Sequence, residues 1–149
     1  MIRIMFVCHG NICRSPMAEF VFRDLLEQRG IADRFLVSSS ATSTEEIGNP
    51  VYPPARRELL RHGIDPSGKT AVQLSRRDYE KYDMFVGMDS ANVRNMNRIF
   101  GDDPDGKIVK LLDFDGGGDV ADPWYTGNFS ITYSDVLRGC EALLAELIE

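Results

Sequence analysis

The residues of this chain that are best suited to chemistry lie near its N-terminus, where five residues separate a cysteine from an arginine. Cys8 follows an apolar run typical of a buried strand, and Arg14 precedes Ser15-Pro16, a pair that favours a helix start with the serine as N-cap. The first N–H groups of a helix lack partners within it, and the helix dipole adds about half a positive charge there. We therefore expect the loop between strand and helix to bind an oxyanion.

The cysteine and the arginine are expected to act on the same bound group. The guanidinium of Arg14 is planar and permanently charged, so it matches two oxygens of a phosphate. A thiol beside an arginine and a helix N-terminus ionises readily, and the thiolate is the nucleophilic form. Ser15 is placed to donate its hydroxyl to that thiolate. The expected chemistry is attack of Cys8 on phosphorus.

The motif Cys8-x5-Arg14-Ser15-Pro16 resembles the active-site loop of the low-molecular-weight protein tyrosine phosphatases, which also carry it near the N-terminus. The resemblance implies that backbone and side chains of this loop hold the substrate phosphate. The residues expected to bind substrate here are His9, Gly10, Asn11, Ile12, Cys13 and Ser15.

The resemblance also implies a support for the loop. In that family a serine at the position of Ser39 hydrogen-bonds with the loop asparagine, here Asn11, and Ser15 belongs to the same support. From the residues alone, Ser39 is equally well a solvated serine at a strand end. The family commonly carries a histidine near the position of Lys69, so this part of the support is expected to differ here.

The second loop cysteine, Cys13, has two interpretations. It either packs within the loop or forms a disulfide with Cys8 under oxidation, which spares Cys8 the irreversible oxidation steps. The family resemblance favours the redox partner.

A long loop near the C-terminus offers a proton donor for the departing oxygen. Four aspartates are candidates, namely Asp113, Asp115, Asp119 and Asp122. We favour Asp122, because Pro123 restrains its backbone and because Asp-Pro followed by two aromatic residues resembles the general-acid loop of the family. Trp124 and Tyr125 are expected to line the substrate pocket and to shield Asp122 from water.

Length and composition point to one soluble domain over residues 1–149, with 43% hydrophobic and 27% charged residues. No apolar run approaches a membrane span of about 20 residues, and the N-terminus lacks a signal-peptide pattern. Three cysteines fit a reducing compartment, so we expect a cytoplasmic protein without a membrane partner. The formal charge of −6 argues against nucleic acid.

The remaining pattern alternates strands and helices. Further strands are expected over residues 34–39, 84–88 and 107–112, and helices from Ser15 to Gly30 and over residues 53–62, 90–100 and 131–148. Ser90 is the expected N-cap of its helix, and Cys140 is expected in the core. Right-handed crossovers then predict an α/β fold, a four-stranded parallel sheet with helices on both faces in a flavodoxin-like three-layer sandwich.

One segment imitates a nucleotide-binding loop. Residues Gly63 to Thr70 fit the pattern G-x4-G-K-[ST], but an amphipathic helix precedes them, whereas that motif must follow a strand and open a helix. Gly63 is better explained as the end of that helix, and Pro66 removes an N–H that a phosphate would need. His62 is expected to be a cation favourable to the helix C-terminus.

These observations predict a phosphatase that cleaves phosphotyrosine in proteins, or small aryl phosphates, through a phosphocysteine, releasing inorganic phosphate without metal or cofactor. Catalysis is assigned to Cys8, Arg14 and Asp122. An arginine phosphatase of the same fold is an alternative, but such relatives typically carry threonine where this chain has Ile12. A phosphate-binding module without turnover is a second alternative, and arsenate reduction would need a second relay cysteine besides the buried Cys140.

The resembled family often carries an aromatic side chain over the pocket, at the position that is Glu45 or Thr44 here. This departure changes the expected substrate preference. Glu45 predicts a weaker affinity for acidic phosphopeptides.

Overall fold

The computed structural model describes residues 1–148 and is built on one sheet of four parallel strands. The strands are β1 (Ile2–Cys8), β2 (Phe35–Ala41), β3 (Met84–Gly87) and β4 (Ile108–Lys110). Their order is β2-β1-β3-β4, with β1 paired to both β2 and β3. The direction of winding therefore reverses at β1, and the crevice at the carboxyl ends of β1 and β3 is where such sheets bind ligands.

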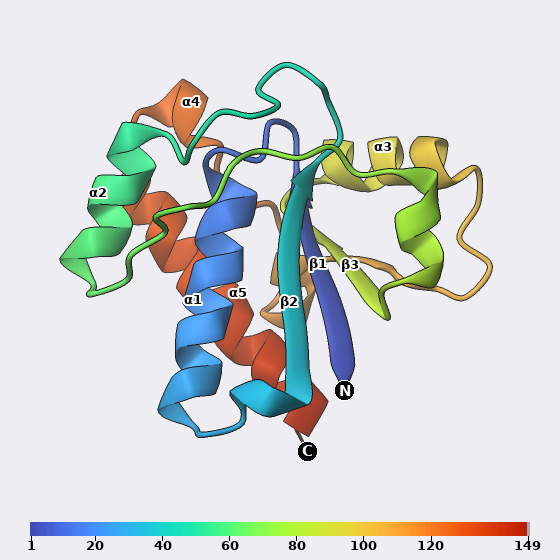
Figure 1. Ribbon diagram of the computed structural model, residues 1–149, viewed down its shortest axis with the longest axis horizontal. Helices are drawn as coiled ribbons and strands as arrows, with labels where there is room; N and C mark the ends of the chain where they lie inside the picture. Colours follow the sequence, from blue (N-terminus) through green and yellow to red (C-terminus); the bar gives the residue numbers. More distant parts are fainter. Residues whose placement is uncertain (149) are drawn as a thin grey trace.

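Helices cover both faces of this sheet (Figure 1). The α-helices are α1 (Arg14–Gln28), α2 (Pro53–Arg61), α3 (Ser90–Phe100), α4 (Pro123–Thr126) and α5 (Phe129–Ile148). Short 3₁₀ helices are η1 (Ala32–Arg34), η2 (Arg76–Glu80) and η3 (Leu111–Phe114). The α1 and α5 helices lie on one side of the sheet and α3 on the other, so the three-layer α/β sandwich is confirmed.

The residues of β1 show why both faces are covered. Every residue from Ile4 to Cys8 is buried, and alternate side chains enter different cores. Ile4 and Phe6 belong to the core under α1 and α5, whereas Met5 and Val7 belong to the core under α3 and η2. The fully buried first strand fixes the position of the loop that follows it.

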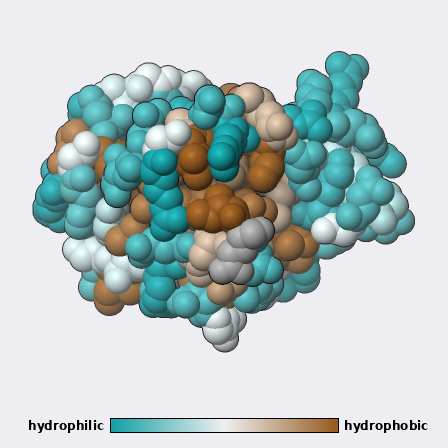
Figure 2. Space-filling view, turned by 90° about the horizontal axis from the view of Figure 1, so that it is seen from below, coloured by the Kyte–Doolittle hydropathy of each residue, from teal (hydrophilic) through white to brown (hydrophobic). Residues whose placement is uncertain are grey.

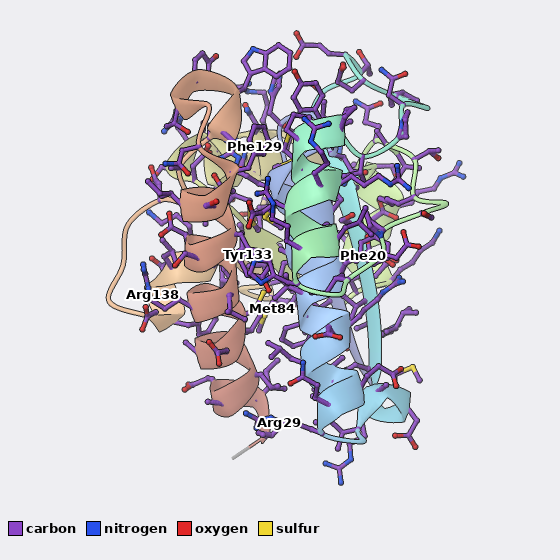
Figure 3. All side chains as sticks on the ribbon, turned by 90° about the vertical axis from the view of Figure 1, so that its left-hand side faces the viewer. Phe20, Arg29, Met84, Phe129, Tyr133 and Arg138 are labelled. Atoms are coloured by element: carbon purple, nitrogen blue, oxygen red, sulfur yellow. The ribbon has the colours of Figure 1, made fainter. Side chains whose placement is uncertain are left out.

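The α1 and α5 helices run side by side, as seen from the left-hand side of Figure 1 (Figure 3). On α5, Gly139 faces Leu111 of η3 so closely that an added Cβ would lie 2.5 Å from the leucine Cγ. Tyr133 stacks on the ring of His62, with ring centroids 3.7 Å apart. Cys140 is fully buried, as expected, and burial raises the pKa of its thiol.

Two helix caps and the ends of several elements differ from the sequence-based expectations, since β2 extends to Ala41 and not to residue 39, and α5 begins at Phe129 and not at residue 131. The first helix begins at Arg14 with Cys13 as its N-cap residue, and the hydroxyl of Ser15 contacts the sulfur of Cys8 and does not cap the helix. Asp89, and not Ser90, is the N-cap of α3, because its carboxylate accepts the N–H of Asn92 at 2.8 Å. The fourth strand ends at Lys110, where the chain turns into η3.

The segment that imitates a nucleotide-binding loop is not one. It follows α2, and Gly63 has a φ of 75°, which suits the end of a helix. Residues 64–70 form turns and extended chain and do not open a helix. His62 ends α2 and contacts Glu58 at 3.0 Å.

The end of the molecule opposite the loop after β1 carries a group of hydrophobic side chains within a mostly hydrophilic surface (Figure 2). No helix within residues 1–148 is long and apolar enough to cross a membrane.

Candidate active site

The loop over residues 9–13 connects β1 to α1 and wraps around the sulfur of Cys8. The backbone N–H groups of Asn11 and Ser15 point at this sulfur over 3.3 and 3.4 Å, and the hydroxyl of Ser15 lies 3.0 Å from it. Asn11 has a φ of 60° and is the only residue other than glycine within residues 1–148 with a positive φ. This left-handed turn directs the loop amides inward.

Side chains behind the loop hold that turn in place. The Nδ2 group of Asn11 donates to Ser15 Oγ at 2.8 Å and to Ser39 Oγ at 3.0 Å. Its Oδ1 atom accepts the backbone N–H of Val72 at 3.1 Å. The hydrogen bond between Asn11 and Ser39 that the resemblance implies is therefore present, and Ser39 is buried and not a solvated strand-end serine.

Arg14 is buried at the start of α1 and lies between two carboxylates. Its Nη1 atom contacts Asp89 Oδ2 at 2.7 Å, and its Nη2 atom contacts Asp122 Oδ2 at 3.4 Å. Burial opposes the charge of Arg14, but Cys8 and both aspartates outweigh burial and raise the pKa of the guanidinium. Arg14 is therefore a fixed positive charge beside the sulfur.

The C-terminal loop brings Asp122 to this arginine. The N–H of Val120 donates to the carbonyl of Met88 at the end of β3, which ties the loop to the sheet. Asp122 then caps the short helix α4, because its Oδ1 atom accepts the N–H of Trp124 at 3.0 Å. Of the four candidate aspartates, only Asp122 lines the pocket that contains Cys8; Asp115 pairs with Arg138, and Asp119 pairs with Lys110.

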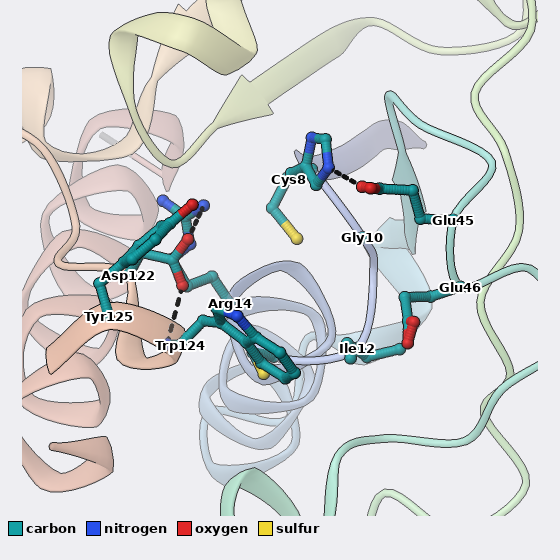
Figure 4. A pocket seen from close by; sticks show the side chains of 11 residues that line it. Cys8, Gly10, Ile12, Arg14, Glu45, Glu46, Asp122, Trp124 and Tyr125 are labelled. Carbon is teal, nitrogen blue, oxygen red and sulfur yellow. Dashed lines mark hydrogen bonds and ion pairs between the residues drawn. The ribbon is translucent and has the colours of Figure 1, made fainter. Parts of the chain in front are cut away.

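The pocket has a volume of about 280 Å³ and opens between two different walls (Figure 4). Trp124 and Tyr125 of α4 form one wall, and Glu45 and Glu46 of the loop after β2 form the other. The two aromatic residues are 62% and 86% exposed and the side chain of Asp122 is 30% exposed, so Asp122 is only partly shielded from water.

The predicted loop residues also lie at this pocket. It is lined by His9, Gly10, Ile12 and Cys13, together with Cys8 and Arg14. His9 reaches across the mouth to contact Glu45. Asn11, Ser15 and Ser39 lie behind the loop, where they contact its sulfur or one another.

Cys13, the last residue of the loop, is buried and has a free thiol. Burial, reinforced by the charges of Cys8 and Asp122, raises the pKa of this thiol to about 12. At neutral pH this thiol is protonated, and its disulfide with Cys8 stays a prediction.

Three residues of the site are absent from the sequence-based prediction, namely Asp89, Tyr52 and Glu46 of the pocket wall. Asp89 holds Arg14, and its position directly after the third strand was the available signal, since that strand ends beside β1. Tyr52 donates its N–H to the carbonyl of Ile12 and packs its ring 5.4 Å from that of Trp124. Tyr52 thus connects the loop over residues 9–13 to α4, and nothing in the local sequence pattern indicates this connection.

A cysteine under loop amides, a buried arginine and an aspartate in one pocket define a phosphatase that works through a cysteine nucleophile. Comparison with known proteins gives the family. The family model described as "Low molecular weight phosphotyrosine protein phosphatase" matches residues 3–149. The chain belongs to this family.

Relatives from distant organisms match along nearly the whole chain. The low molecular weight protein-tyrosine-phosphatase YfkJ of Bacillus subtilis is 39% identical, covering 99% of this chain and 96% of its own. Its crystal structure superposes with a TM-score of 0.95, over 99% of this chain and 94% of that one. The low molecular weight phosphotyrosine protein phosphatase of Rattus norvegicus is 37% identical, covering 95% and 92% of the two chains. The chain is therefore an enzyme of this phosphatase family.

Proposed function

We propose that residues 1–149 form a single domain that hydrolyses phosphotyrosine in proteins, as well as small aryl phosphates. The observation that carries the proposal is the joint presence of Cys8, Arg14 and Asp122 at one pocket. The family match over residues 3–149 supports a single domain. Free thiols at all three cysteines and a net charge of −6 support a cytoplasmic enzyme that acts on proteins and not on nucleic acid.

In the first step the thiolate of Cys8 attacks phosphorus in line, and the bond from phosphorus to the phenolic oxygen breaks. Asp122 donates its proton to that oxygen, so tyrosine leaves as a neutral phenol. The guanidinium of Arg14 and the loop N–H groups hold the three remaining oxygens of the phosphoryl group. The product of this step is a phosphocysteine.

In the second step water attacks the phosphocysteine, and Asp122 accepts a proton from it. The sulfur–phosphorus bond breaks, inorganic phosphate is released and the thiolate of Cys8 is restored. The Ser15 hydroxyl, 3.0 Å from the sulfur, stabilises the departing thiolate.

The walls of the pocket favour an aryl substrate. Ile12 at the loop and the rings of Trp124 and Tyr125 offer apolar surface to an aromatic ring. A phosphoarginine would place a polar guanidinium group against the same surface, which gives it fewer partners. Phosphoarginine is the second candidate substrate.

The test is hydrolysis of p-nitrophenyl phosphate and of a phosphotyrosine peptide without added metal, by wild type, Cys8→Ser and Asp122→Ala. We expect no turnover from Cys8→Ser and a loss of kcat of about 100-fold or more from Asp122→Ala. A phosphoarginine peptide serves as the competing substrate.

Two results would contradict the proposal. A higher kcat/KM for phosphoarginine than for phosphotyrosine would keep the mechanism and change the substrate. Absence of turnover with both substrates, while phosphate still binds, would make the protein a binding module.

A further inference from the structure

A buried chain of polar side chains extends from the sulfur of Cys8 to the middle of α1. It passes from Ser15 to Asn11, from Asn11 to Ser39, and from Ser39 Oγ to Glu19 Oε1 at 2.6 Å. Each of these residues is at most 3% exposed. Buried polar groups of this kind keep their hydrogen bonds because water cannot replace them.

The donor and the acceptor of each link follow from two groups with fixed roles. At one end the N–H of Val72 is a donor only, so the oxygen of the Asn11 amide must face it. The amide nitrogen of Asn11 then faces Ser15 and Ser39 and donates to both hydroxyl oxygens. Each hydroxyl proton must therefore point elsewhere.

At the other end the carboxylate of Glu19 is an acceptor only. It accepts the hydrogen bond that the Ser39 hydroxyl donates, which leaves the oxygen of Ser39 free to accept from Asn11. The proton of Ser15 has two acceptors within reach, the sulfur of Cys8 at 3.0 Å and the carbonyl of Ser40 at 3.5 Å. The nearer one is the sulfur.

Two cations hold the carboxylate of Glu19 in this role. Arg23, one turn further along α1, contacts Oε2 at 2.6 Å. Lys69 lies 4.0 Å from Oε1 and donates to the carbonyl of Ser39 at 2.9 Å. Burial lowers the pKa of Lys69, and the carboxylate of Glu19 opposes this effect.

We propose that Glu19 is a positioning residue, whose carboxylate acts together with the N–H of Val72 at the other end to fix the direction of this hydrogen-bond chain, so that Ser15 presents its proton to the sulfur of Cys8. No bond breaks and no proton is transferred along the chain. The role of Glu19 is to favour the thiolate, both in the free enzyme and when sulfur leaves the phosphocysteine. The inference rests on the proposed function of Cys8 as the nucleophile.

The variant Glu19→Gln tests the direction of the hydrogen-bond chain. It keeps the shape of the side chain but has one acceptor oxygen in place of two. Arg23 carries a charge and attracts that oxygen, so the amide nitrogen faces Ser39 Oγ. Ser39 Oγ then has two donors aimed at it and no acceptor for its own proton. The double change Glu19→Gln with Arg23→Met frees the amide oxygen for Ser39 and restores the original direction.

The measurement is the rate of alkylation of Cys8 by iodoacetamide as a function of pH, with the modified cysteine identified by peptide mass spectrometry. This rate follows the thiolate without any need for turnover, so it is separate from the test of the proposed function. We expect the pH midpoint to rise by about one unit in Glu19→Gln and to return toward the wild-type value in the double variant. In p-nitrophenyl phosphate hydrolysis we expect kcat to fall and KM to change little.

The matched control is Glu27→Gln, an exposed glutamate on the same helix, which should leave the midpoint unchanged. An unchanged midpoint in a folded Glu19→Gln variant, verified by circular dichroism, would overturn the proposal. A double variant that stays shifted would overturn the assigned direction. If Glu19→Gln does not fold, Ser39→Ala cuts the same chain at its centre and must raise the midpoint, and an unchanged value there would equally overturn it.

Discussion

At the scale of single residues, Arg14 is held between two carboxylates that have different surroundings. Asp89 is 2.7 Å from the guanidinium and also caps α3, whereas Asp122 is 3.4 Å away and caps α4. The guanidinium of Arg14 must be held in one orientation to bind two phosphate oxygens at once, and the 2.7 Å contact with Asp89 holds it there. Asp89 therefore orients Arg14, and Asp122 stays available for proton transfer.

We expect Asp89→Asn to lower kcat for p-nitrophenyl phosphate about tenfold, because a misplaced guanidinium stabilises the transition state less well. Stability should fall by about 1–3 kcal/mol, because asparagine still caps α3 but no longer offers the buried guanidinium a charged partner. Steady-state kinetics and thermal unfolding measure the two effects.

The control for this change is Asp119→Asn, which removes a carboxylate that pairs with Lys110 and not with Arg14. It should keep the wild-type kcat. If Asp89→Asn also keeps it, Asp89 does not orient the arginine.

At the scale of elements, the site depends on how α5 packs against η3, the short helix that precedes the loop carrying Asp122. Gly139 gives α5 its close approach to Leu111, at the start of η3. The η3 helix directly precedes the loop that carries Asp122. The packing of a helix far from the pocket therefore sets where that loop begins.

Gly139→Ala is expected to destabilise the protein by about 1–2 kcal/mol. The new Cβ would overlap the fully buried Leu111, and overpacking of this kind costs about 1–3 kcal/mol, more than the gain of up to about 1 kcal/mol in helix propensity. Thermal unfolding measures the change, with the exposed Ser134→Ala on the same helix as control. A Gly139→Ala variant as stable as wild type would show that Leu111 moves freely.

The sequence pattern predicts the elements better than their ends. The apolar run before Cys8 and the Ser15-Pro16 pair place a strand and a helix correctly, because burial and helix initiation act locally. The caps are predicted less well, since Ser15 bonds a sulfur that the loop brings back to it, and Asp89 competes with Ser90 for one cap. Such choices depend on contacts between segments that are distant in the sequence.

The same limit applies to the site. Cys8 and Arg14 are close in sequence and share one loop, so their spacing alone indicates the pocket. Tyr52 and Glu19 act through segments that only the fold brings together, and a glutamate in an amphipathic helix is otherwise an ordinary solvent-facing residue.

At the scale of the whole molecule, the enzyme is acidic and its ligand is an anion. The net charge is −6, and the wall formed by Glu45 and Glu46 adds negative charge at the mouth of the pocket. Positive charge is supplied inside, by the buried Arg14 and the loop amides. A small phosphate ester contacts only the positive interior, whereas a long acidic substrate is also repelled by the negative charges of Glu45 and Glu46.

We expect Glu45→Gln to lower KM about threefold for a phosphotyrosine peptide with acidic flanking residues, and to leave KM for p-nitrophenyl phosphate unchanged. Because Glu45 is exposed, higher salt should lower the wild-type KM for the acidic peptide in the same way. Glu141→Gln, an exposed change on α5, is the control. An unchanged KM for the acidic peptide would reject a role of Glu45 in substrate choice.

The pocket joins β1 to the short helix α4, which follows much later in the sequence. A ribosome adds about 5–20 residues per second, so Cys8 is synthesised several seconds before Asp122. During that interval the growing chain carries the nucleophile and its arginine but neither the acid nor the helix α5 that covers the first core. Turnover therefore cannot begin before Asp122 and α5 have been synthesised, and the first phosphatase activity in a cell-free translation mixture reports that these late segments have folded onto β1 and α1.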